Sequence, residues 1–166
     1  MGATGWDYFT PYQENIEKAL QELQQKVLES GKYGPASQFT PELLKQFPQL
    51  KASADMLKTL DEQVLREFGP IKSIDDLREA FAEAGTHTII DIERISTEPN
   101  IGIAYPVPRD IIQKIYGTIK PSHGDVESKH GCLSETLNIK RFQAVYLIVY
   151  ENDIPKEIYF EGCSGD

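Results

Sequence analysis

The sequence has very few residues of the kinds that build disulfide frameworks or metal sites. Only two of its 166 residues are cysteine and three are histidine. Two cysteines are too few to hold a small secreted domain together, so we expect a reducing compartment. The set His123, His130, Cys132 and Cys163 lacks the spacing of the common zinc motifs. We therefore expect no metal site.

The chain also lacks the motifs of membrane insertion, export and nucleotide binding. No apolar run reaches the roughly 18 residues that cross a bilayer, and the first residues lack the regions of a signal peptide. No glycine-rich phosphate loop and no serine-hydrolase elbow occurs. We expect a cytoplasmic protein that has no cofactor and no membrane contact.

Basic residues are outnumbered by acidic ones. The sequence has 17 lysines and arginines and 26 aspartates and glutamates, which gives a net charge of -9. This charge repels phosphate backbones, and the basic residues are scattered, so nucleic acid is not an expected partner. The same charge suits a basic protein partner. The length and a hydrophobic content of 40% predict a single domain over residues 1–166, of undetermined oligomeric state.

The first half of the chain is predicted to be mainly helical. Thr10, Pro11 and Gln13 have the pattern of a helix start with a capping box, and apolar residues then recur every three or four positions up to Gly31. We expect a helix over residues 11–30. Similar cap and periodicity signals predict further helices over residues 41–48, 50–68 and 74–84.

The second half carries the strand signals. The β-branched run His87–Ile95 predicts a strand, and residues 144–150 and 156–160 predict a hairpin around a turn at 151–153. The aromatic segment Trp6–Phe9 predicts a fourth strand. These elements indicate an α+β fold, with a mainly antiparallel sheet of three to four strands and several helices packed on it. Between the strands we expect a loop over 99–106 and helices over 109–116 and 125–139.

One face of the expected strand at 87–95 is a candidate site. An alternation of two would put His87, Asp91 and Glu93 on the same face. An imidazole beside two carboxylates could share acid and base roles, although the same pattern fits the solvent face of a half-buried strand. Trp6 and Tyr8 belong to a crowded aromatic set that could line a pocket, anchor a partner or pack in the core.

Three segments carry a resemblance to a known group of proteins. They are Gly2–Phe9, Gly85–Ile92 and Glu157–Gly162. Together they resemble segments of a family of small uncharacterised bacterial proteins. The resemblance implies a bacterial cytoplasmic protein, and it implies no activity and no catalytic residue.

Two functions remain open from the sequence. The first is a non-enzymatic protein-binding domain, of a regulatory or immunity-like kind, which the net charge and the missing catalytic motifs favour. The alternative is a small enzyme or ligand-binding protein whose site contains His87, Asp91 and Glu93, with Trp6 and the C-terminal tail over it.

Overall fold

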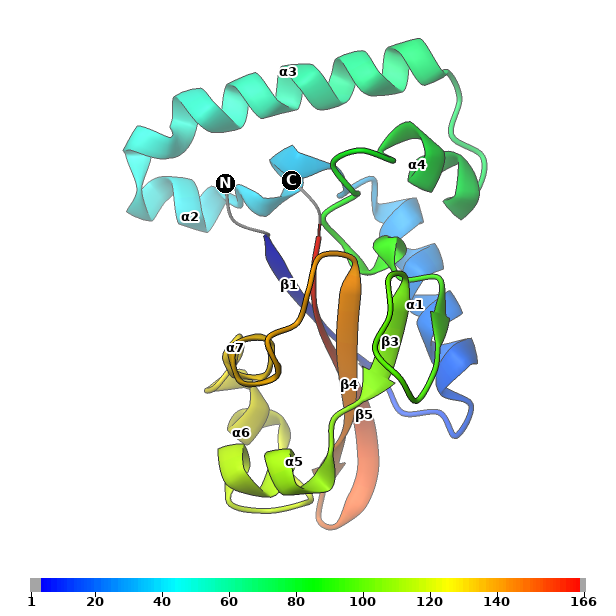
Figure 1. Cartoon of the computed structure of the whole chain (residues 1–166). Helices are drawn as coiled ribbons and strands as arrows, with labels where there is room; N and C mark the ends of the chain where they lie inside the picture. The colour runs from blue at the N-terminus through cyan, green and yellow to red at the C-terminus, as the bar shows by residue number, and fades with distance from the viewer. Residues whose placement is uncertain (1–3, 165–166) are drawn as a thin grey trace.

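The computed structural model describes residues 4–164, which form an α+β fold around one five-stranded sheet (Figure 1). None of the helices in this range is long and apolar enough to cross a membrane. The strands are β1 (Gly5–Pro11), β2 (Arg94–Ile95), β3 (Ile103–Pro106), β4 (Gln143–Glu151) and β5 (Ile154–Cys163). The α-helices are α1 (Ile16–Ser30), α2 (Pro41–Gln46), α3 (Lys51–Phe68), α4 (Ile74–Ala80), α5 (Arg109–Tyr116), α6 (His123–Glu127) and α7 (Cys132–Leu137).

The sheet is mixed rather than mainly antiparallel. Its strand order is β1-β5-β4-β3-β2. The pairs β1–β5 and β4–β5 are antiparallel, whereas β3–β4 and β2–β3 are parallel. Helices α5 to α7 form the crossover that returns the chain from β3 to β4, as parallel neighbours require. The expectation of a mainly antiparallel sheet of three to four strands was therefore wrong in both respects.

Each face of the sheet is covered by helices. Side chains of β5 alternate between the two faces: Phe160 lies in the core shared with α1, and Tyr159 lies in the core shared with α5, α6 and α7. Helix α3 lies farther out, beyond α2 and α4 in Figure 1. Only Ala54 and Asp61 of its 18 residues are buried.

Most of the local signals are confirmed. Thr40 caps α2, and Ser73 caps α4 with a complete capping box. Helix α1 ends at Gly31 and α5 ends at Gly117, both in the left-handed conformation that glycine tolerates. The strand at Trp6–Phe9 and the C-terminal hairpin are also present, as β1 and β4–β5.

Four predictions of individual elements were also wrong. The first helix begins at Ile16 with Asn15 as its cap, because residues 5–11 pair with β5 instead. Residues 87–95 contain a short 3-10 turn (Ile89–Asp91) and only the two-residue strand β2. The expected loop at 99–106 contains β3. The expected helix at 125–139 is split into α6 and α7, because Gly131 adopts a left-handed φ of 83° between them.

Candidate functional site

The segment Gly85–Ile92 is buried throughout although it is mostly irregular. Gly85 and His87 have left-handed φ angles of 81° and 55°. Such a backbone is uncommon for histidine and is found where surrounding structure enforces it. Buried backbone groups outside a helix or sheet need other hydrogen-bond partners. In this segment, its own side chains and side chains from elsewhere in the fold supply many of them.

Asp91 accepts hydrogen bonds at both carboxylate oxygens. Its Oδ1 accepts from Thr86 N at 2.6 Å and from Thr86 Oγ1 at 2.8 Å. Its Oδ2 accepts from Ser164 Oγ at 2.6 Å. The side chain is only 9% exposed. Asp91 therefore fixes the irregular segment and the end of β5 together, and its hydrogen-bonding capacity is largely used.

Trp6 joins the same cluster from β1. Its Nε1 donates to Ser164 Oγ at 3.1 Å, so Ser164 lies between Trp6 and Asp91. The ring packs against Gly162, where a Cβ would come within 2.4 Å of Trp6 Cζ2. Trp6 and the tail as far as Ser164 thus lie near Asp91, as expected, whereas residues 165 and 166 of the tail lie outside the described residues. Residues 5–9, 89–91 and 157–162, which belong to the three segments singled out in the sequence, also lie close together: β1 pairs with β5 and contacts the turn at 89–91.

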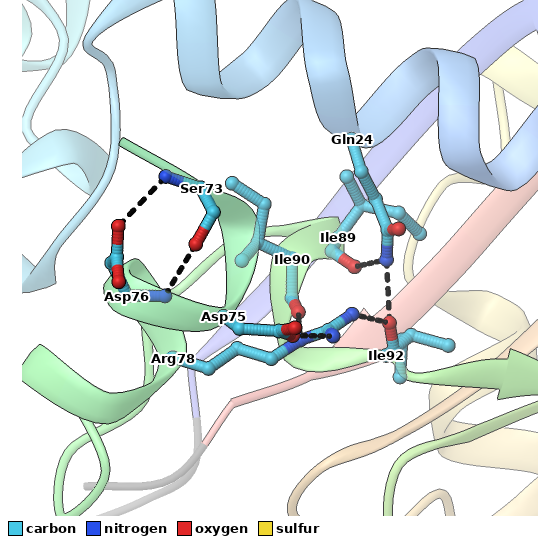
Figure 2. A network of polar contacts seen from close by, with 8 residues as sticks. All are labelled: Gln24, Ser73, Asp75, Asp76, Arg78, Ile89, Ile90 and Ile92. Carbon is cyan, nitrogen blue, oxygen red and sulfur yellow. Dashed lines mark hydrogen bonds and ion pairs between the residues drawn. The ribbon is translucent and has the colours of Figure 1, made fainter. Parts of the chain in front are cut away.

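Two long side chains hold the other side of the segment, as Figure 2 shows. Gln24 of α1 donates from Nε2 to the carbonyls of Ile89 and Ile92. Arg78 of α4 donates from Nε to Ile90 O at 2.7 Å and from Nη2 to Ile92 O at 2.6 Å. The carbonyl groups that a strand would use in a ladder are therefore bonded to side chains instead.

The predicted site residues divide between two pockets. His87, Trp6 and Tyr8 line a pocket of about 370 Å³, which we call the His87 pocket. Asp91 and Glu93 line a different pocket, of about 220 Å³. Because residues 87–93 do not form a strand, the shared face predicted for His87, Asp91 and Glu93 does not exist. A catalytic role for these residues stays a prediction, and the pockets do not bring the three together.

The His87 pocket lies along β1. Residues 4–8 form one wall, and the end of α1 together with the loop that follows it forms the other with polar side chains. Val27 of α1 and His87 complete the lining. The polar wall consists of Ser30, Lys32, Ser37, Gln38 and Thr40.

Hydrogen bonds at both ends of the β1–β5 ladder fix which residues of β1 face its open edge, the side away from β5. Tyr12 N donates to Lys156 O at 3.0 Å, and Ser164 N donates to Thr4 O at 2.9 Å. Because such bonds recur at every second residue, the even-numbered residues of β1 bond to β5. No other strand within residues 4–164 pairs with β1. The residues whose N–H and C=O groups both face the open edge are Gly5, Asp7 and Phe9.

Tyr8 in this pocket should be a protonated hydrogen-bond donor at neutral pH. Burial, followed by the nearby Asp7 and Asp91 carboxylates, raises its pKa from 10.0 to about 12. In the unfolded chain the phenol ionises near its ordinary value. The stability that Tyr8 contributes is therefore complete below about pH 10 and is lost as the pH rises toward 12.

Replacing Tyr8 by Phe should remove that part of the alkaline sensitivity. We expect Tyr8→Phe to lose less free energy of unfolding than the wild type between about pH 8 and about pH 11. Urea denaturation of both proteins at the two pH values would measure this. An equal loss in both would show that Tyr8 is not responsible.

Sequence reasoning did not identify Gln24, Arg78 or Ser164. Gln24 had one signal: it lies between Leu20 and Val27 on the buried side of α1, where a polar residue needs a partner. Ser164 was included only as part of the tail. Arg78 had no such signal, because the carbonyl groups that it bonds lie 12 and 14 residues away in the sequence. Among residues 4–164, no group of three or more His, Cys, Asp or Glu side chains is arranged to hold a metal ion.

Comparison of the chain with protein-family models, with curated proteins and with solved structures found no match.

Proposed function

We propose that this chain is a cytoplasmic protein-binding domain that takes up an extended segment of a basic partner protein along the open edge of β1. The observation that carries the proposal is the coincidence of that edge with the His87 pocket. An edge strand offers backbone donors and acceptors, and a neighbouring pocket offers space for side chains. These are the two requirements for recognition by strand addition.

The length of the exposed edge supports a short, defined contact. Gly5, Asp7 and Phe9 provide three N–H and three C=O groups, enough for one short added strand. Pro11 ends the edge because it has no N–H to donate. A segment paired here would direct alternate side chains toward Trp6 and Tyr8, which line the pocket.

Charge supports a basic partner. The net charge of -9 attracts cationic proteins and speeds their association. Asp7 places one carboxylate on the edge strand, and among the described residues Lys32 is the only lysine or arginine in the lining. A small acidic protein that covers a basic partner would act as a regulatory or immunity-like protein.

Selection from a displayed library of linear peptides, followed by binding to two variants, tests the proposal. Gly5→Pro removes an N–H that faces the open edge and leaves the bonds to β5 intact. Gly5→Ala is the matched control, since its Cβ would lie 3.9 Å from the nearest atom. We expect enriched peptides to be basic, to bind Gly5→Ala normally and to bind Gly5→Pro at least about tenfold more weakly. No enrichment, or equal binding to both variants, would contradict the proposal.

Small-ligand binding in the same pocket is the second candidate function. The left-handed His87 backbone favours it, because strained residues gather at sites of binding and catalysis. A thermal-shift screen against metals, nucleotides and metabolites tests it. A shift that disappears in His87→Gly, which accepts the same backbone conformation, would favour this function over peptide binding.

A further inference from the structure

A third pocket lies between α3 and the loop of residues 31–41. It has a volume of about 410 Å³, and we call it the Asp61 pocket. Tyr33, Phe39 and Leu65 supply apolar walls. It borders the His87 pocket, because Lys32, Ser37 and Thr40 line both.

Asp61 is a buried carboxylate in this cavity. It is 8% exposed, and its Oδ2 accepts a hydrogen bond from Ala36 N at 2.8 Å. Within residues 4–164 its Oδ1 accepts no hydrogen bond and the carboxylate forms no ion pair, although Lys32 and Lys58 line the same cavity. Burial raises the pKa of this carboxyl, and the Ala36 hydrogen bond offsets part of that increase. A carboxylate this buried ordinarily has a cationic partner.

The loop of residues 31–41 packs closely against the Asp61 carboxylate. Gly34 has a left-handed φ of 88°, and a Cβ there would lie 2.7 Å from Asp61 Oδ2. Gly34 N also donates to Thr86 O at 2.7 Å, which joins the loop to the buried segment described above. The pocket is therefore held by the fold on both sides, and is not a gap beside a loose loop.

We propose that the Asp61 pocket binds an organic ammonium group, either of a small free amine or of a lysine side chain. The Asp61 carboxylate would neutralise the charge, and its free oxygen would accept an N–H hydrogen bond. The rings of Tyr33 and Phe39 would contact the cation and its alkyl chain. The hydroxyls of Ser37 and Thr40 would accept further N–H bonds. This site does not depend on the proposed strand addition, since a small amine alone is enough to test it.

Titration of the protein with n-butylammonium, followed by amide NMR, tests the site. We expect shifts centred on residues 33–40 and on Asp61. Asp61→Asn keeps an oxygen for Ala36 N–H but removes the charge, so it should fold normally and bind at least about tenfold more weakly. Glu67→Gln, which removes an exposed carboxylate of α3 outside the lining, should bind within about twofold of the wild type.

The neutral analogue n-butanol completes the test. The ammonium site would be overturned if n-butanol bound as tightly as n-butylammonium, if Asp61→Asn bound as tightly as the wild type, or if the wild type gave no shifts. Short peptides with one lysine distinguish the two sources. If such a peptide binds the wild type and binds Asp61→Asn more weakly, the natural ligand is the lysine of a partner protein. If only free amines bind, the natural ligand is a small metabolite.

Discussion

Asp91→Ala is expected to lower the free energy of unfolding by about 3–5 kcal/mol. The substitution leaves three buried donors without their acceptor: Thr86 N–H, the Thr86 hydroxyl and the Ser164 hydroxyl. Each buried group left unpaired costs about 1–3 kcal/mol. Since small domains are stable by only about 5–15 kcal/mol, urea denaturation followed by circular dichroism should show a large shift of the midpoint.

Glu93→Ala is the matched control. Glu93 is another acidic residue two positions away, but it is exposed. We expect its replacement to change the free energy of unfolding by less than about 0.5 kcal/mol. Similar losses in the two variants would contradict the structural role given to Asp91.

Gly162→Ala should destabilise the protein by about 3 kcal/mol. A methyl group at this position would lie 2.4 Å from Trp6 Cζ2 and 2.9 Å from the Cβ of Ala144. The indole ring would have to move, which would break its hydrogen bond to Ser164. Trp6 is the only tryptophan, so the fluorescence spectrum of the native state should change together with the stability.

Gly124→Ala provides the comparison for this variant. Gly124 lies in α6, and no atom comes within 4 Å of a Cβ built there. Alanine favours a helix by up to about 1 kcal/mol relative to glycine, so this variant should be as stable as the wild type or slightly more stable. If Gly162→Ala kept both the stability and the fluorescence of the wild type, the packing of Trp6 on Gly162 would be disproved.

Elements with signals inside their own sequence could be predicted. Ser73 and Thr40 cap helices as expected, because a cap is a contact across only three residues. The C-terminal hairpin was also predictable. Its turn residues Asn152 and Asp153 both adopt left-handed φ angles, as a two-residue hairpin turn demands.

The start of the first helix shows how a long-range contact overrides a local one. Thr10 and Pro11 have the pattern of a cap, and so does Asn15 five residues later. Pairing of residues 5–11 with β5 decides between them, and β5 lies about 150 residues away in the chain. Nothing in the local sequence contains that information.

The candidate site could be predicted only in part. Trp6, Tyr8 and His87 do share a pocket, whereas the alternation that grouped His87 with Asp91 and Glu93 assumed a strand. β-Branched residues are common both in strands and in segments that are buried on all sides. Composition therefore could not distinguish a strand from a buried irregular segment. Thr86 and Thr88 bond to Asp91 and to Ile90 N, and such side-chain bonds compete with a ladder.

Amide hydrogen exchange along β1, measured by NMR in the free protein and with a selected peptide bound, tests the central claim most directly. In the free protein, the amides of Trp6, Tyr8 and Thr10 should exchange at least about a hundredfold more slowly than those of Gly5, Asp7 and Phe9. Bound peptide should then slow exchange at Asp7 and Phe9. If these outward amides were already protected in the free protein, or stayed unprotected with peptide bound, strand addition at β1 would be contradicted.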